Sequence, residues 1–288
     1  MSRRRSPSAV RPWDVQEDVS RPPHYPYKLQ KRLPPVPDYP DPPIHEVILD
    51  LKFQQELESG DVERIPERLG GAWNPTTVSQ FELRPGGAMR VSEGEFAHWV
   101  AEEVSDCKWI TRASGTNVTL NSVRPGVWPT GEYVGWPVIR SRWRDLLQRV
   151  GPVYANPIGR CGLRYINKLA IPEDVGLAGS MTLHLAAPEI LFNEVNFQFR
   201  QTWSSIRGFE DLAATVVFAR LPAEQLPCPD GHSAAVLDID VFNYRVSDSP
   251  TLDGALEWFE RAHEAENAIF EACVAEGLRE RLMKEQPI

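Results

Sequence analysis

One stretch near the middle of the chain, Gly159 to Pro172, limits the possible folds more than any other. Its residues alternate between apolar and polar side chains with a period of two. The apolar positions are Cys161, Leu163, Tyr165, Leu169 and Ile171, and the polar ones include Arg160, Arg164 and Lys168. This alternation is typical of a β-strand with one buried face and one polar face. We therefore predict a central strand in a sheet that is covered on one side.

The residues before this strand predict a first group of elements. Apolar alternation begins at Ile44, and Pro137 suits the first turn of a helix whose apolar residues recur at helical spacing. The expected elements are a strand at 44–53, a short helix at 55–70 that ends at Gly70 and Gly71, strands at 79–84, 88–93, 108–113 and 117–123 with a poorly defined segment at 96–100, and a helix at 136–150. The short strands predict an antiparallel meander.

The residues after the central strand repeat the same order of elements. We expect a linker with helical character at 173–192, strands at 194–203, 212–221 and 234–246, and a long helix at 252–284. The order of elements thus occurs twice, at 44–150 and 158–285, which indicates a pseudo-repeat. We predict an α+β fold of two pseudo-repeated antiparallel sheet-plus-helix halves with a long C-terminal helix, each half burying one face of its own sheet. The expected domains are 1–43, 44–150 and 151–288.

Residues 1–43 differ in composition from the rest of the chain. They hold 11 of its 26 prolines, which lack a backbone donor for a sheet and favour extended polyproline conformation. We predict a disordered arm that contributes nothing to folding. The alternative is a docking peptide, in which the PPVP segment and Tyr25, Tyr27 and Tyr39 lie along a groove on the body or on a partner.

The net charge of −9 limits the classes of partner. Nucleic acids and anionic membranes attract a positive surface, so we expect binding to neither. The four cysteines lack the spacing of a zinc site or a disulfide framework, and no apolar run approaches the ~18 residues of a membrane span. We expect a cytoplasmic protein with reduced thiols and no cofactor.

Four segments of the body carry recognisable motifs: PPIHEVILDLKF, CGLRYINKLAIP, DIDVF and HEAENAIFEACVAEGLRERLM, the last with His263 and Phe270. In these segments the chain resembles a sporadically distributed family of bacterial proteins of uncharacterised function. That family has a PPI-EVI N-terminal strand, an LRYIN central strand and a C-terminal helix with an H-to-F spacing. The resemblance extends from Pro42 to Met283 and implies a bacterial gene that travels with mobile or defence-related loci. It implies no catalytic residue.

The terminal helix contains a candidate acid–base pair, His263 and Glu266. Both fall on the apolar stripe of the helix, within one turn of each other. A buried histidine beside a carboxylate can transfer protons. The alternative, which we favour, is a core histidine that bonds to a neighbouring strand.

Two further candidate sites lie on strands. Asp238 and Asp240 leave the same face of one strand and can hold a divalent cation if a third oxygen ligand lies near; otherwise they form the polar side of an exposed strand. Arg160, Arg164 and Lys168 form a cationic row that can receive phosphates. The helix before this row adds Arg140, Arg142, Arg144 and Arg149. In an acidic body we expect the row to pair instead with carboxylates such as Asp238 and Asp240.

No nucleophile constellation, metal motif or glycine-rich phosphate loop stands out in the sequence. Our leading hypothesis is therefore a non-catalytic binding or interaction protein whose partner is another protein, since polar open sheet faces suit recognition. The alternative is an enzyme or sensor that acts on a nucleotide or polyphosphate in a charged groove between the sheets, as in triphosphate-tunnel proteins. A deep concave site that joins the cationic row to Asp238 and Asp240 would favour the alternative.

Overall fold

The computed structural model describes residues 39, 41–83, 89–104, 107–126, 128, 133–182, 198–221, 226–243, 245, 247 and 249–284, without the side chains of 77–95, 177, 178, 283 and 284. Val36–Ile288 forms one compact unit. Most of the predicted arm, and residues 183–197 of the predicted linker and strand, lie outside the described residues.

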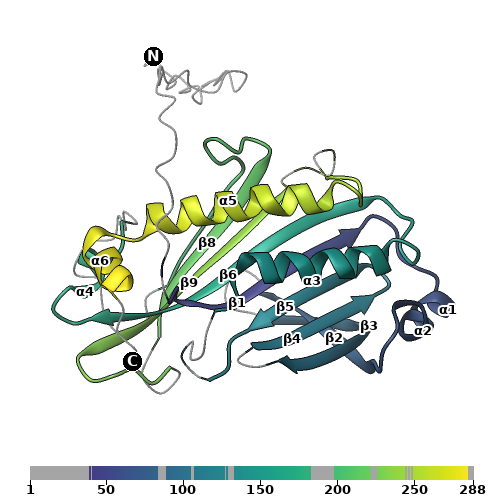
Figure 1. Cartoon of the computed structure of the whole chain (residues 1–288), viewed down its shortest axis with the longest axis horizontal. Coiled ribbons are helices and arrows are strands. Elements are labelled where there is room, and N and C mark those ends of the chain that lie inside the picture. Colours follow the sequence, from purple (N-terminus) through teal and green to yellow (C-terminus); the bar gives the residue numbers. More distant parts are fainter. Residues whose placement is uncertain are drawn as a thin grey trace, which may run out of the picture. The chain divides into compact units, whose positions relative to one another are not determined.

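The described strands form a single nine-stranded antiparallel sheet (Figure 1). From one edge to the other their order is β2-β3-β4-β5-β1-β6-β9-β8-β7. The strands are β1 Ile44–Phe53, β2 Asn74–Leu83, β3 Met89–Val104, β4 Cys107–Ser114, β5 Asn117–Val123, β6 Ile158–Pro172, β7 Gln198–Trp203, β8 Leu212–Arg220 and β9 His232–Asn243. β1 and β6 therefore lie at the centre and pair with each other.

The helices found in the described residues are α1 Ser59–Val62, α2 Ile65–Leu69, α3 Gly135–Val150, α4 Gly176–Ser180, α5 Ala255–Cys273 and α6 Glu276–Lys284. The two longest, α3 and α5, lie side by side on one face of the sheet (Figure 1). We call the opposite face the open face. Within the described ranges, no helix combines the length and the apolar character needed to cross a membrane.

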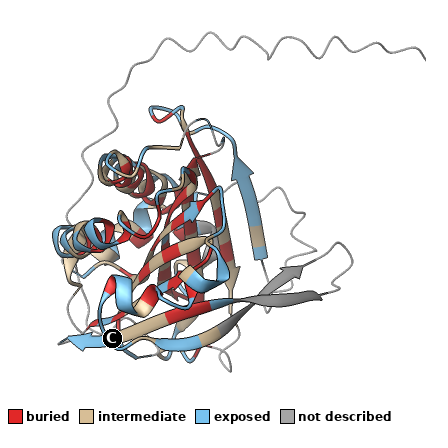
Figure 2. Cartoon of the chain, turned by 90° about the vertical axis from the view of Figure 1, so that its right-hand side faces the viewer, coloured by how far each residue is buried: buried red, intermediate tan, exposed pale blue. Residues whose placement is uncertain are grey.

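The core fills the space between the sheet and these two helices (Figure 2). Leu49 of β1 and Leu163 of β6 lie opposite each other on the helix side, and both are fully buried. The helices meet the sheet with Trp143 of α3 and Phe259 of α5, whose rings contact edge to face with centroids 5.1 Å apart. Burying each such side chain is worth about 1.5–3 kcal/mol. The apolar half of each strand thus determines which face carries the helices, and the polar half is left on the open face.

The prediction of an α+β fold with an antiparallel sheet and a C-terminal helix is confirmed. The predicted central strand is β6. The expectation of a separate sheet in each half is wrong, because β1 and β6 pair along their length and join both groups of strands into one sheet. Alternation reveals the two faces of a strand but not its neighbours.

The terminal helix predicted at 252–284 is two helices. α5 ends at Cys273 because Val274 takes an extended conformation, with φ −89° and ψ 125°. Val274 is fully buried and forms an antiparallel bridge with Met181. This long-range contact breaks the predicted helix before α6 begins.

Two expectations about the first half also differ from the structure. The helix expected at 55–70 is the pair α1 and α2, and the second of these has Pro66 in its first turn. The poorly defined segment at 96–100 lies inside β3, which continues to Val104.

The end of the predicted arm contacts the body. The ring of Tyr39 meets Phe270 edge to face, with centroids 5.9 Å apart, and its hydroxyl donates to Glu271. Asp41 pairs with the buried Arg124 at 2.7 Å. Tyr39 and Asp41 therefore contact the body, which the expectation of a disordered arm did not include.

Candidate functional site

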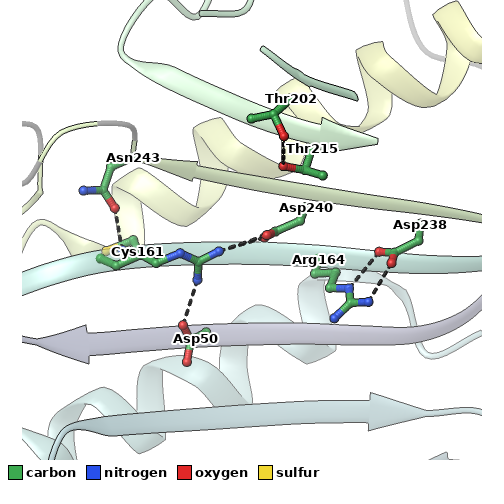
Figure 3. Close-up of polar contacts among 9 residues, drawn as sticks. Asp50, Cys161, Arg164, Thr202, Thr215, Asp238, Asp240 and Asn243 are labelled. Carbon is green, nitrogen blue, oxygen red and sulfur yellow. Dashed lines mark hydrogen bonds and ion pairs between the residues drawn. The ribbon is translucent and has the colours of Figure 1, made fainter. Parts of the chain in front are cut away.

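The centre of the open face carries an ion-pair network built from three strands (Figure 3). Arg160 of β6 lies between two carboxylates. Its Nη1 donates to Asp50 of β1 at 2.8 Å, and its Nη2 donates to Asp240 of β9 at 2.9 Å. The guanidinium also lies over the ring of Phe242, 5.2 Å from the centroid. Arg160 therefore ties the central strands together across the open face.

Gly162 makes room for this arrangement. It is the next residue after Arg160 on the same face, since side chains on one face are two residues apart. A Cβ atom at Gly162 would lie 2.4 Å from Nη1 of Arg160, which is too close for non-bonded atoms. The absence of a side chain at Gly162 thus lets the guanidinium reach Asp50 and Asp240.

Arg164 forms the second ion pair of the network. Its Nε and Nη2 donate to the two carboxylate oxygens of Asp238, at 2.7 and 2.6 Å. This two-pronged arrangement is the strong form of an arginine–carboxylate pair. The side chain of Asp238 is only 14% exposed, so its charge depends on the arginine for solvation.

Further polar contacts extend the network across the sheet. Asn121 of β5 donates to Glu46 of β1 at 2.6 Å. On the other side, the hydroxyl groups of Thr202 of β7 and Thr215 of β8 lie 2.9 Å apart (Figure 3). Neighbouring strands of the open face are therefore joined by side chains as well as by their backbones.

The electrostatics of the network follow from partial burial. Burial raises the pKa of Asp50 and Asp240 above the usual carboxylate range, and the nearby Arg160 opposes the rise in both. Hydrogen bonding to Asp238 raises the pKa of Arg164. Burial lowers the pKa of Lys168, and the charge of Glu46 opposes that change. Asp50 and Asp240 therefore depend on Arg160 to keep their charges.

The prediction that the cationic row pairs with local carboxylates is confirmed for Arg160 and Arg164. The structure brings both arginines to Asp238 and Asp240, and it adds Asp50. The sequence contained a signal for Asp50, because it alternates with Leu49 and Leu51 on the predicted first strand.

Lys168 lies further along β6 than the two arginines, and its backbone amide donates to Pro43 at 2.9 Å. The carboxylates of Asp238 and Asp240, which were candidates for a metal site, bond to arginine side chains. Within the part of the chain that the structure describes, no three His, Cys, Asp or Glu side chains are grouped so that they could hold a metal ion.

His263 lies on the helix side of the sheet, between α5 and β6. Its Nδ1 is 2.8 Å from the hydroxyl of Tyr165, and its Nε2 accepts from the side-chain amide of Asn267 at 3.1 Å. The ring stacks on Trp136, with centroids 4.4 Å apart and 12° between the planes. Burial lowers the pKa of His263 to about 4, so the ring is neutral at pH 7.

Glu266 is buried on the same helix, with 1% of its surface exposed. Burial raises its pKa well above the usual carboxylate range, and its Oε1 has no hydrogen-bond partner among the described residues. The hydrogen bonds of His263 go to Tyr165 and Asn267 rather than to Glu266. A catalytic dyad needs a carboxylate that orients and charges the imidazole. The geometry instead favours the structural role of His263.

The four arginines of α3 do not join the row on the open face, because α3 lies beside α5 on the other face of the sheet (Figure 1). Arg140 pairs with Glu260 of α5, and Arg142 pairs with Glu102 of β3 at 2.8 Å. Arg142 and Arg149 line a cleft beside α2. Sequence reasoning missed this cleft, since its walls come from segments that are far apart in the chain.

No protein-family model matches the chain, and no curated protein matches it in sequence. The resemblance to the bacterial family therefore rests on the motif residues alone.

Proposed function

We propose that this chain is a non-catalytic binding protein of the bacterial cytoplasm that recognises another protein through the open face of its sheet. One observation carries the proposal: the central arginines are already bonded to Asp50, Asp238 and Asp240. Because the charged side chains on this face are paired with one another, their hydrogen-bond donors and acceptors are held in fixed positions. Such a pattern suits recognition of a complementary protein surface and the rejection of other surfaces.

The same ion pairs count against a nucleotide or polyphosphate enzyme. A phosphate that bound Arg160 or Arg164 would displace a carboxylate and leave it partly buried without a partner. Breaking a fully buried pair costs about 3–5 kcal/mol, and the cost is smaller here because Arg164 is 44% exposed. His263 contacts Tyr165 and Trp136 on the other side of the sheet, so it cannot act as a general base on this face.

We further propose that the two halves of the body are a structural duplication. In each half the first strand lies beside the last, β1 beside β5 and β6 beside β9, and a long helix follows. The remaining strands run outward to β2 on one side and to β7 on the other. In this interpretation β1 and β6 are equivalent strands that meet at the centre.

Membership of the bacterial family with the PPI-EVI and LRYIN motifs is part of the same proposal. Tyr165 of the LRYIN segment and His263 of the terminal helix are 98 residues apart and share a hydrogen bond of 2.8 Å. Motif residues that meet in one core are expected when the motifs specify a common fold. Any link to mobile or defence loci follows from the resemblance alone.

A charge swap on the open face tests the proposed function. Arg164→Asp combined with Asp238→Arg keeps an ion pair but exchanges its two charges, so we expect the variant to fold with little loss of stability. A protein captured by the wild-type chain from a bacterial lysate is purified, and its dissociation constant is measured with purified components. We expect the swap to weaken the complex at least about tenfold, equivalent to ~1.4 kcal/mol.

The matched control is the swap of Arg261→Asp with Asp211→Arg. This pair lies at α5, away from the open face, and its arginine is 44% exposed, the same fraction as Arg164. We expect the control to leave the affinity unchanged. Equal affinities for all three chains, or a loss confined to the control, would contradict the proposal.

A further inference from the structure

A cleft of about 560 Å³ lies between the end of α2, the strands β3 to β5, and α3. Trp109, Leu120 and Leu146 lie at its base and are nearly inaccessible to solvent, and polar side chains make up much of its remaining lining. The volume falls in the range of about 300–1,000 Å³ that is typical of small-molecule sites. The cleft is on the helix side of the sheet, so it is separate from the ion-pair network of the open face.

The turn after α2 forms one wall of the cleft. Gly70 and Gly71 have φ angles of +74° and +99°, which glycine adopts without strain. The turn brings Trp73 to the cleft, where its indole Nε1 donates to the carbonyl of Gly70 at 2.6 Å. An aromatic ring therefore stands across the cleft from α3.

The helix α3 forms the opposite wall. Its lining residues Arg142, Asp145, Leu146 and Arg149 are spaced by three and four, so they share one helix face. Leu146 lies at the base of the cleft, and the two arginines lie where the cleft opens to solvent. A single face of α3 thus combines an apolar side chain, two cations and the carboxylate of Asp145.

The two arginines differ in how they are held. Arg142 stacks on Trp109 at 4.6 Å from the ring centroid and pairs with Glu102, whose side chain is 58% exposed. Exposed pairs of this kind are worth about 0–1 kcal/mol, so an anion can replace Glu102. The Nε of Arg149 donates to the backbone carbonyl of Asp145 at 3.3 Å. Among the described residues, the terminal nitrogens of Arg149 have no hydrogen-bond partner.

We propose that this cleft binds a small organic anion with a flat apolar body, whose acidic group bonds to Arg149 and Arg142. The body of the ligand lies in the cleft beside Trp73, above the buried Trp109 and Leu146. The acidic group is a carboxylate, sulfonate or phosphate, because the planar donors of arginine match the oxygens of all three. This binding activity is independent of protein recognition by the open face.

Two fluorescent probes with the same body test the charge requirement on the full chain. 1-Anilinonaphthalene-8-sulfonate carries an acidic group, and N-phenyl-1-naphthylamine is its uncharged counterpart. We expect the sulfonate to bind at one site per chain and at least about tenfold more tightly than the amine. Arg149→Ser is expected to weaken the sulfonate about tenfold, because a hydrogen bond to a charged group is lost, and to leave the amine unchanged.

Three variants check the assignment of the site. Trp73→Ala is expected to weaken both probes, and Glu102→Gln is expected to tighten the sulfonate by releasing Arg142. Arg144→Ser removes a charge from α3 outside the cleft lining and is the matched control, with no expected change. Urea unfolding of each variant verifies that the fold is intact.

Competition with naphthalene-based ligands identifies the acidic group. Displacement of the sulfonate probe by 1-naphthoate or by 1-naphthyl phosphate supports the proposal, and the stronger competitor indicates the head group. The proposal is overturned if the two probes bind equally well, if Arg149→Ser and Arg144→Ser have the same effect, or if the sulfonate fails to saturate at one site.

Discussion

The His263→Gln variant is expected to lose less stability in acid than the wild type. Burial lowers the pKa of His263 from 6.5 to about 4, so the unfolded chain takes up a proton at a pH where the folded chain does not. The stability that the neutral ring contributes is complete above pH 6.5 and is lost as the pH falls toward 4. At 1.36 kcal/mol per pH unit, the full effect is roughly 3 kcal/mol.

Urea unfolding at pH 7.5 and pH 4.5 measures this effect in both chains. Glutamine can bond to Tyr165 and Asn267 but carries no titrating group. We expect the free energy of unfolding to fall by about 2–3 kcal/mol more in the wild type than in the variant. Other titrating groups are present in both chains and cancel in the comparison, among them His45, Asp50, Asp240 and Glu266. The same pH dependence in both chains would refute a neutral, buried His263.

Three further predictions concern the open face, the core and the arm. Arg160→Met leaves Asp50 and Asp240 without their shared cation. We expect a loss of about 2 kcal/mol at pH 7.5, below that of a fully buried pair because Arg160 is 34% exposed. The loss is expected to shrink as the pH is lowered, because burial raises the pKa of both carboxyls and favours their protonation. Glu266→Gln replaces a buried acid whose raised pKa reduces stability as the pH rises, so urea unfolding is expected to find the variant more stable than the wild type at pH 8 and equal to it near pH 4. Deleting residues 1–40 removes Tyr39 from Phe270 and Glu271, and we expect the melting temperature to fall by about 2–4 °C. A loss in Arg160→Met that does not change with pH would contradict the ion pairs of Arg160. A Glu266→Gln variant that is no more stable than the wild type at pH 8 would contradict the burial of Glu266. An unchanged melting temperature after the deletion would contradict the packing of Tyr39 on the body.

The strands could be predicted from the sequence because their two faces are a local property. In β5, Val118 and Leu120 alternate with polar residues, and both predicted ends of the strand agree with the structure. β6 begins at Ile158, one residue before the predicted start, and its polar positions Arg160 and Arg164 indicated the charged face. The pairing of this face with carboxylates followed from the excess of acidic residues in the body.

The partners of each strand could not be predicted, because pairing depends on residues that are distant in the chain. Nothing in the alternation of β1 indicates that Asp50 lies beside Arg160, which is 110 residues away. The end of α5 could not be predicted for the same reason. Val274 suits a helix by local pattern, but the bridge to Met181 draws it into an extended conformation.

The surroundings of His263 were partly predictable. Its spacing from Leu256, Phe259 and Phe270 placed it on the buried stripe of the helix, and a bond to a strand was expected. Its ring stacks on Trp136 in the first turn of α3, and no periodicity in α5 indicates this contact. The cleft beside α2 likewise depends on packing between α2 and α3.

Isothermal titration of ATP and inorganic triphosphate decides between protein recognition and phosphate chemistry on the open face. The experiment uses the wild-type chain and Arg164→Glu. We predict that neither chain binds either ligand more tightly than about 1 mM, equivalent to −4.1 kcal/mol, because Asp50, Asp238 and Asp240 already hold the two arginines. Micromolar binding by the wild type that disappears in Arg164→Glu would contradict this result and assign a polyphosphate ligand to the open face.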